Sequence, residues 1–402
     1  MRVRHLALAA LVAVAGCLSP VDPSSVRIAA IRVTIGDGQH TVDTIRVRRT
    51  ARIQAAAFAS QGYDLGITSF HYASSDTSVA TVDQSGIVRG VAPGTATITV
   101  AAPQGHSATV TVVVRTTTVE FTIPLGSAPG DIAFSQDYAR AYVTTGGDSL
   151  AVLDAFGFLR IRSIAIGLPE AHVAASSDAV FITHPTVDSV TVVSIGSSTI
   201  ARRIHVAGAP DAVVASASAA FVASRDGTSI SVLDASGIIG SIALGGSPRQ
   251  LAVARTSALL FATVNAGGAW TLVAADQSRR TVLGSIALPG PALAVTANGD
   301  GSRVYVLLAD GEIRAFTATT GGALTAAGSF ATHNGATDIA ARIVGPTDLV
   351  VSGEPVLLVD GPTLAIFDQV AGAGNGSVAI RPDGLFAFIA VPGSRTINVV
   401  GL

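Results

Sequence analysis

The sequence predicts an all-β protein in which a β-sandwich is followed by a β-propeller. Three observations support this prediction. Short runs of alternating apolar and polar residues extend along the chain, separated by Gly, Pro, Asn and Asp. Near residue 115 these runs give way to a unit that returns about every 40 residues. Although 49% of the residues are hydrophobic, no segment after residue 18 has the roughly 18 continuous apolar residues of a transmembrane helix.

The first residues have the pattern of an export signal. Arg2, Arg4 and His5 form a basic start, and residues 6–14 form an apolar segment that is too short to span a bilayer. The segment ends in VAGC at residues 14–17. We therefore expect this protein to be exported.

Cys17 is the only cysteine in the chain. With the residues before it, Cys17 resembles the lipobox of bacterial lipoproteins. This resemblance implies that Cys17 is diacylated and that the chain is cut before it. We expect a signal peptide at residues 1–16, a lipid-anchored tether at residues 17–25, and membrane attachment through the Cys17 lipid. The alternative is an incidental cysteine behind a cleaved signal.

The resemblance also implies a location. Leu18 follows the cysteine, so the aspartate that retains lipoproteins in the inner membrane is absent. The expected location is the cell envelope, at the outer membrane.

The composition excludes several kinds of function. A net charge of −2 with 13% charged residues provides no field to attract nucleic acid. All 25 basic residues are arginine, which excludes any chemistry that needs a lysine. A lipidated Cys17 leaves no thiol for a disulfide, a zinc site or a nucleophile. We expect no cofactor, no metal and no nucleic-acid partner.

Residues 26–115 contain the first domain. Their alternating strands predict a β-sandwich of about 90 residues. Residues 72–100 read YASSDTSVATVDQSGIVRGVAPGTATITV, which resembles the bacterial Ig-like domain (group 2), with Tyr72 where that family usually has tryptophan. Alternate apolar side chains are expected to face the core between the sheets: Val79, Val82, Ile87, Val91, Ile98 and Val100.

Residues 116–402 form the repeating part. Three stretches begin at Ser149, Ser189 and Ser229, forty residues apart each time. A period of about 40 residues with four short strands per unit predicts a β-propeller. Residues 140–154, RAYVTTGGDSLAVLD, resemble the YVTN-type propeller repeat of bacterial surface proteins.

The number of blades follows from the expected inner strands, which are rich in Ala and small β-branched residues. They lie at residues 131–135, 172–176, 212–216, 251–254, 293–297, 338–342 and 377–381. Seven blades are therefore expected; six or eight stay open because repeats five and six are degenerate. The last repeat ends after its third strand. We expect residues 118–125 to close the ring by completing that last blade.

Candidate ligand-binding residues are the polar residues at the start of the inner strands. They are Asp131, His172, Asp211, Arg249, Gln250 and Asp338. Such loops converge on one mouth of a propeller channel, where these side chains could hold a cation or a sugar. The alternative is that they bond neighbouring strand ends and trapped water.

A second set of acidic residues follows the expected third strands. We expect these residues to cap turns rather than to bind a metal: Asp154, Asp234, Asp276 and Asp368.

Three functions are consistent with the sequence. The first is a lipid-anchored, non-enzymatic binding or adhesion protein with a protein or glycan ligand. The second is a propeller enzyme of the lyase or lactonase kind, which needs His172 or His184 near carboxylates at one channel mouth. A histidine that points into a blade interface would argue against this enzyme. The third is a scaffold subunit of an envelope complex, with an exposed apolar patch on one face. We expect no catalytic residue because no G-x-S-x-G or H-E-x-x-H motif occurs.

Overall fold

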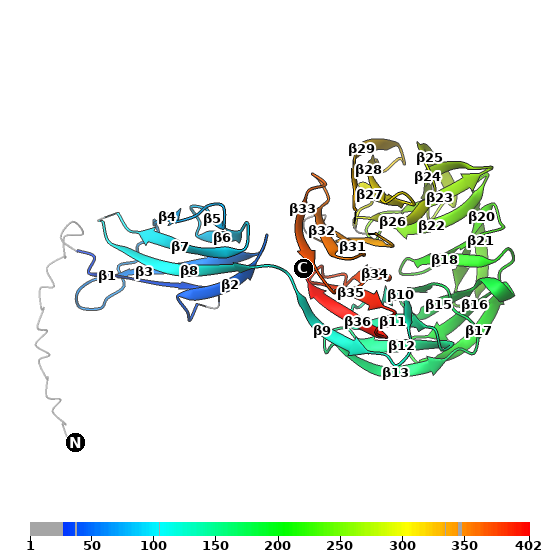
Figure 1. The fold of residues 1–402 in the computed structure, drawn as a ribbon, viewed down its shortest axis with the longest axis horizontal. Helices are drawn as coiled ribbons and strands as arrows, with labels where there is room; N and C mark the ends of the chain where they lie inside the picture. Colours follow the sequence, from blue (N-terminus) through cyan, green and yellow to red (C-terminus); the bar gives the residue numbers. More distant parts are fainter. Residues whose placement is uncertain (1–26, 37, 104, 334, 345–347) are drawn as a thin grey trace, which may run out of the picture. The chain divides into compact units, whose positions relative to one another are not determined.

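The computed structural model describes residues 27–402 except 37, 104, 334 and 345–347 (Figure 1). Cys17, with the predicted signal peptide, tether and lipid site, lies outside the described residues. The chain divides into two compact units, residues 1–115 (unit 1) and 116–402 (unit 2). Within the described ranges no helix is long and apolar enough to cross a membrane.

Unit 1 consists of two four-stranded sheets. The first has the order β1 (Ala30–Ile35), β3 (Thr50–Phe58), β6 (Ile87–Gly90) and β5 (Ala80–Val82). The second has the order β2 (Val42–Arg46), β8 (Ser107–Arg115), β7 (Gly94–Ala101) and β4 (His71–Ser74). The pair β2–β8 is parallel, and the other pairs are antiparallel.

The core of unit 1 follows the two-residue period of its strands. Ile98 and Val100 are fully buried, as the sequence predicts. Val79 and Val82 are partly buried, and two core predictions are wrong. Val88, and not Ile87, is fully buried in β6. Val91 is 43% exposed because it lies beyond the end of β6, where the alternation of faces has stopped.

Unit 2 consists of antiparallel sheets arranged around a centre (Figure 1). Its described residues form seven four-stranded sheets, which we number as blades 1 to 7. Blades 1 to 3 are β10 (Pro129–Phe134), β11 (Arg140–Thr145), β12 (Ser149–Asp154), β13 (Leu159–Ala165); β14 (Val173–Ala175), β15 (Ala179–His184), β16 (Ser189–Ser194), β17 (Thr199–His205); and β18 (Pro210–Ala215), β19 (Ala220–Ser224), β20 (Ser229–Asp234), β21 (Gly237–Ala243). A short 3-10 helix, Pro185–Val187, joins β15 to β16.

The remaining blades have the same order of strands. Blades 4 and 5 are β22 (Ser247–Val253), β23 (Leu259–Ala266), β24 (Ala269–Asp276), β25 (Thr281–Leu288); and β26 (Ala292–Ala297), β27 (Arg303–Leu308), β28 (Glu312–Ala318), β29 (Leu324–Ala331). Blades 6 and 7 are β30 (Ile339–Ala341), β31 (Asp348–Val351), β32 (Val356–Asp360), β33 (Ile366–Val370); and β34 (Val378–Ile380), β35 (Phe386–Val391), β36 (Thr396–Gly401), β9 (Val119–Pro124).

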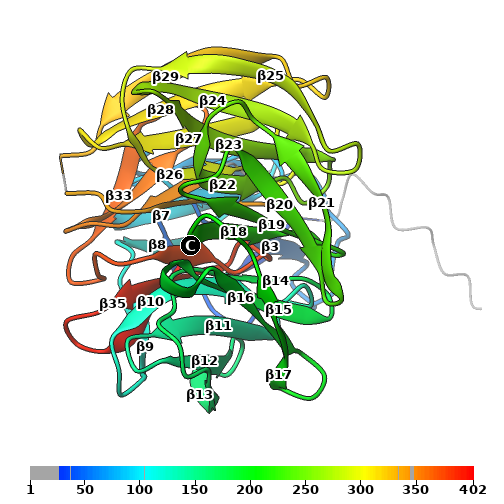
Figure 2. The ribbon, with the colours of Figure 1, turned by 90° about the vertical axis from the view of Figure 1, so that its right-hand side faces the viewer.

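Burial changes from the centre of unit 2 to its rim. All six residues of β15 are buried, whereas most residues of the fourth strand β13 are exposed. Figure 2 shows fourth strands such as β13, β17 and β21 on the outside. Because the middle strands are covered on both faces by neighbouring blades, they have continuous apolar sequences rather than alternating ones.

Blade 7 contains strands from both ends of unit 2. Strand β9 pairs antiparallel with β36, with Ile123 opposite Ile397. Thr122 also donates a hydrogen bond to Asn398, at 2.9 Å. This is the segment to which the sequence assigns ring closure, and its pairing covers the edge that β36 would otherwise expose.

Aromatic rings gather where blade 7 meets blade 1. Phe134 and Phe388 pack edge to face at 5.0 Å, and Phe158 and Phe386 at 4.9 Å. The guanidinium of Arg381 lies 4.6 Å from the Phe386 ring. Each such aromatic pair contributes about 0.5–1.5 kcal/mol beyond the burial of its area. The seam that joins the two ends of the ring is therefore reinforced by side chains as well as by β9.

Turn capping occurs where predicted for three of the four aspartates. Asp154, Asp234 and Asp276 accept backbone N–H groups two and three residues further on, at 2.7–3.0 Å. Asp368 does not cap a turn.

Asp368 lies inside the fourth strand β33, and its Oδ2 accepts the N–H of Thr117 at 2.7 Å. Asp360 ends the third strand and accepts the N–H of Thr363 at 2.8 Å. Asp360 precedes a Gly-Pro turn, whereas Asp368 stands in an alternating run, and this difference decides which aspartate caps.

Candidate functional site

A cavity of about 590 Å³ lies among the first strands of the blades. Each of the seven blades contributes residues to its wall, either from its first strand or from the residues just before it. The predicted channel is therefore present as a hollow that a small ligand could enter.

One residue per blade forms what we call the mouth ring. Six of them stand just before the residue that forms the first pair between the first and second strands after any bulge. In blade 4 the ring residue is Gln250, which itself forms that pair with Thr263 and whose N–H donates to the Thr263 hydroxyl. In blade order, the mouth ring is Asp131, His172, Ala212, Gln250, Leu293, Asp338 and Ser377. All seven line the cavity.

Four of the six predicted site residues belong to this ring, and two do not line the cavity. Asp211 precedes the ring residue Ala212 and is buried. Arg249 lies at the β-bulge between Pro248 and Gln250. Both residues lie at β-bulges of their first strands, and in each case the next residue along the strand lines the cavity instead.

Four of the polar ring residues are held by hydroxyl groups that lie in the second strands or, for Ser352, just after one. Four backbone N–H groups donate to these hydroxyls at 2.8, 3.1, 3.1 and 3.1 Å. The pairs are Asp131 with Thr144, His172 with Thr183, Gln250 with Thr263, and Asp338 with Ser352. The backbone that carries each side chain is therefore fixed within its own blade.

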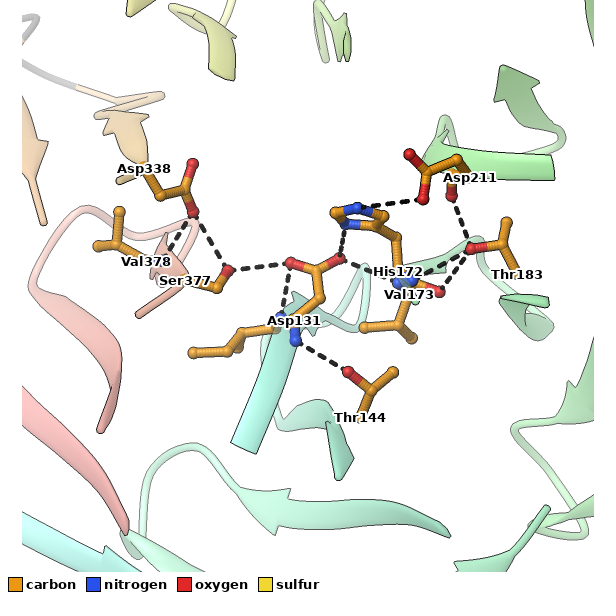
Figure 3. Close-up of polar contacts among 10 residues, drawn as sticks. Asp131, Thr144, His172, Val173, Thr183, Asp211, Asp338, Ser377 and Val378 are labelled. Carbon is orange, nitrogen blue, oxygen red and sulfur yellow. Dashed lines mark hydrogen bonds and ion pairs between the residues drawn. The ribbon is translucent and has the colours of Figure 1, made fainter. Parts of the chain in front are cut away.

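The polar side chains form a chain of contacts across the mouth (Figure 3). The Nδ1 of His172 is 3.3 Å from Oδ2 of Asp131, and its Nε2 is 3.7 Å from Oδ1 of Asp211. On the other side, the hydroxyl of Ser377 lies 2.9 Å from Oδ1 of Asp131 and 3.2 Å from Oδ2 of Asp338. A hydroxyl has one proton, so Ser377 can donate to only one of the two carboxylates at a time.

Two of the carboxylates also tie neighbouring blades together. Asp131 accepts the N–H of Val173 at 2.9 Å, and Asp338 accepts the N–H of Val378 at 2.9 Å. Each bond joins one blade to the first strand of the next. The alternative to ligand binding, in which these residues bond neighbouring strand ends, is therefore present for both aspartates. Both aspartates nevertheless line the cavity.

Asp211 does not line the cavity, but it stabilises the imidazole of His172. Its Oδ2 accepts a hydrogen bond from Nε of Arg225 at 2.7 Å. Its Oδ1 is buried without a hydrogen-bond partner among the described residues, and it lies 3.7 Å from Nε2 of His172. The result is a line of alternating charges: Asp131, His172, Asp211 and Arg225.

These contacts set the protonation of the mouth. Burial would lower the pKa of His172, but the hydrogen bond and charge of Asp131, with Asp211 and Asp338, raise it to about 9. Burial would raise the pKa of Asp131, but its bonds to His172, Val173 and Ser377 lower it overall. Near neutral pH the mouth therefore contains a cationic imidazole beside an ionised Asp131.

Asp338 differs from Asp131. Burial first, and then repulsion by Asp131, raise its pKa to about 6, against the hydrogen bonds from Val378, Ile339 and Ser377. No cation forms an ion pair with it within the part of the chain that the structure describes. Near neutral pH it is a carboxylate without a counterion at the edge of a cavity.

His184 does not belong to the mouth. It is fully buried, with Nδ1 2.7 Å from the carbonyl oxygen of Pro169 and Nε2 2.8 Å from the hydroxyl of Thr191. Burial lowers the pKa of His184. It points into its blade, and that position excludes it from chemistry in the channel.

The described residues contain no group of three or more His, Cys, Asp or Glu arranged to hold a metal ion. The six predicted residues also omit Ser377, which joins Asp131 to Asp338 across two blades. A signal for the polar ring positions was present in the second strands. Where the ring residue is Asp, His or Gln, the second strand supplies a Thr or Ser.

Fold and site together define a class, an all-β protein in which an Ig-like module precedes a β-propeller with a polar channel mouth. This combination is consistent with a binding or scaffold role. The family model of the bacterial Ig-like domain (group 2) matches residues 44–112, so unit 1 contains this domain. A comparison with curated proteins finds no match.

Solved structures show the fold of the remainder. The chain is similar to Kuenenia stuttgartiensis hydrazine synthase, with a TM-score of 0.60, 17% identity, and coverage of 69% of this chain and 96% of that chain. It is also similar to the β-propeller domain of Myceliophteria thermophila Cps50 (Swd1), with a TM-score of 0.61, 11% identity, and coverage of 71% and 99%. At these identities the similarity shows the fold alone.

Proposed function

We propose that this chain is a lipid-anchored binding protein of the cell envelope, and that its propeller binds a small ligand at the mouth ring. In this proposal the Cys17 lipid attaches the chain to the membrane and the Ig-like domain acts as a spacer. The ligand carries a cationic group, such as an amine, and an apolar part.

The uneven chemistry of the mouth ring is the observation that carries this proposal. Four consecutive blades supply polar side chains, Asp338, Ser377, Asp131 and His172. The other three supply Ala212, Gln250 and Leu293. Leu293 is 41% exposed and lines the cavity. The cavity therefore presents carboxylates and, from the blade next to that of Asp338, an exposed apolar side chain.

The charges select the kind of ligand. Asp338 is the acidic ring residue that forms no ion pair with a described cation, so an ammonium group beside it would replace the lost hydration of the carboxylate. An apolar group on the ligand would gain by covering Leu293.

His172 meets the geometric condition that the enzyme alternative sets, because it lies between two carboxylates at the channel mouth. General base catalysis needs a neutral imidazole, however, and a pKa of about 9 keeps His172 protonated near neutral pH. This electrostatic setting favours binding over proton abstraction.

The scaffold alternative calls for apolar side chains gathered on one face. The exposed apolar residues on the fourth strands belong instead to several blades. They are Leu159 and Ile161 of β13, Ile200 of β17, Ile238 and Ile239 of β21, Val282 of β25, Ile366 of β33 and Phe121 of β9. This spread does not favour a single docking face.

The binding proposal is tested with two probes of matched shape, hexylammonium and 1-hexanol. Calorimetric titration of the full-length protein near neutral pH should show hexylammonium binding about 10-fold or more tightly than hexanol. Asp338→Asn should remove this preference. Asn can still accept the N–H of Val378, so the fold should persist.

Asp234→Asn is the matched control, because Asp234 caps a turn at the outer strand. It should bind like the original protein. Binding should also weaken as the pH falls below about 6, where Asp338 takes up a proton. Equal binding of the two probes, or an Asp338→Asn variant that keeps the preference, would refute the proposal.

The anchor is tested separately by Cys17→Ser and membrane fractionation. The variant should leave the membrane fraction. Retention of the variant in that fraction would contradict the lipid anchor without bearing on the mouth ring.

A further inference from the structure

The far end of the same cavity carries a positive charge. Arg255 lines the cavity and lies two residues beyond the end of β22, whose Gln250 belongs to the mouth ring. An extended chain from Gln250 to Val253 covers roughly 10 Å. Arg255 therefore lies at the end of the channel opposite the mouth ring.

The backbone of Arg255 is fixed to blade 5. Its N–H donates to the carbonyl oxygen of Gly299 at 2.9 Å, and the N–H of Thr256 donates to the same oxygen at 2.9 Å. The position of the side chain is therefore set by the scaffold and not by a free loop.

The side chain of Arg255 reaches from blade 4 to blade 1. Its Nη1 lies 3.4 Å from Oε1 of Gln136, and its guanidinium carbon lies 5.9 Å from the centre of the Tyr138 ring. Gln136 is itself oriented by a hydrogen bond from its Nε2 to the carbonyl oxygen of Ala175, at 2.9 Å. These residues hold the guanidinium across the channel.

Arg255 differs from two other arginines that follow first strands. Arg342, after β30, pairs with Asp348 at 3.2 Å, and Arg381, after β34, pairs with Asp383 at 2.8 Å. Arg255 forms no ion pair with a described carboxylate. Burial also lowers its pKa, which is the sign of a cation that lacks a counterion.

We propose that the Arg255 end of the channel is an oxyanion site, which binds a carboxylate or phosphate group of a ligand in the cavity. A guanidinium has five N–H donors in a planar fork, and one long hydrogen bond to Gln136 uses only one of them. The remaining donors match two oxygens of a carboxylate or phosphate. This site does not require the mouth ring to bind anything.

The test is calorimetric titration of the full-length protein with sodium benzoate and with inorganic phosphate, in a chloride buffer of low ionic strength. At least one probe should bind in a saturable manner, and comparison of the two shows whether carboxylate or phosphate is preferred. Arg255→Gln should weaken that binding about 10-fold or more. Arg255→Lys should weaken it less, because the charge stays and the fork is lost.

Arg249→Gln is the matched control, since Arg249 lies in β22, the strand that leads to Arg255, but does not line the cavity. Asp234→Asn is the second control, because Asp234 caps a turn at an outer strand and does not line the cavity. Both variants should bind the anion like the original protein. The proposal is overturned if neither probe shows saturable binding, or if Arg255→Gln binds both as tightly as the original protein. If Arg255→Gln does not fold, unchanged binding by Arg255→Lys has the same meaning.

Discussion

The two halves of the mouth ring occupy the same place in the fold but differ in chemistry. Blades 6, 7, 1 and 2 place Asp338, Ser377, Asp131 and His172 around the cavity, whereas blades 3 and 5 place Ala212 and Leu293 there. Each of these blades is a four-stranded sheet with the same order of strands. A carboxylate at this position is therefore not a requirement of blade formation. The contacts of the carboxylates explain how the polar half is held. The neutral half shows that a blade can form without a carboxylate at this position.

The largest expected effect comes from giving the polar half the chemistry of the neutral half. Asp131→Leu removes the acceptor of the Val173 N–H and the partner of His172 and Ser377. We expect a loss of about 2–3 kcal/mol in the free energy of unfolding, measured by urea denaturation. A loss below about 0.5 kcal/mol would show that the two halves are energetically equivalent.

The charge of His172 gives the second prediction. Its pKa is about 9 in the folded protein against 6.5 unfolded, so the stability it contributes is complete below about 6.5 and is lost as the pH rises through 9. The free energy of unfolding should fall more over this range in the original protein than in His172→Gln. Parallel pH profiles would contradict the ion pairs described here.

The same ion pair predicts a shift in the titration of His172. Asp131→Asn removes the charge that most strongly raises its pKa. The pKa of His172, followed by NMR of its ring protons, should therefore move down toward 6.5. A pKa that stays at about 9 would mean that Asp211 and Asp338 alone keep the imidazole protonated.

A smaller effect is expected from the hydroxyl between the two carboxylates. Ser377→Ala removes one hydrogen bond that Asp131 and Asp338 share, and should cost about 1 kcal/mol in the free energy of unfolding. The pKa of Asp338 should rise above 6, because the hydroxyl now lowers it. An unchanged pKa would show that Ser377 donates to Asp131 alone.

The smallest effect is the reverse exchange, in which the neutral half receives a carboxylate. Leu293→Asp places a charge at a side-chain position that is already 41% exposed. This substitution should change the free energy of unfolding by less than about 0.5 kcal/mol. A large loss in the same denaturation assay would show that Leu293 has a structural role at the mouth.

Local patterns were sufficient for the elements of this protein but not for every assignment. Strand alternation and the forty-residue repeat predicted the all-β architecture and the positions of the inner strands. Asp368 was assigned to a turn because it follows an apolar run, yet Asp360 takes that place. Val91 was assigned to the core because it continues a pattern that ends with β6. The Val91 error arises at a strand end, where a periodic pattern does not show where pairing stops. The Asp368 error arises because an apolar run does not by itself distinguish a third strand from a fourth.

The site shows a different limit. Asp131, His172, Gln250 and Asp338 could be recognised because each is a polar residue before a strand of small apolar residues. Ser377 stands before its strand in the same way, but its role between two carboxylates could not be recognised, because that role depends on Asp131, which lies 246 residues away in the sequence. Arg255 was missed for the same reason, since its neighbour Gln136 is 119 residues distant.

The sequence by itself determined which segments become strands, because the period of apolar residues along a segment is a local property that favours one secondary structure over another. It also determined the kind of first domain, through the motif at residues 72–100. Only the tertiary structure decided which polar residues share a mouth, which of them stay charged, and that Arg255 faces the opposite end of the channel. Those properties depend on distances between blades and on burial, which appear only when the ring has closed.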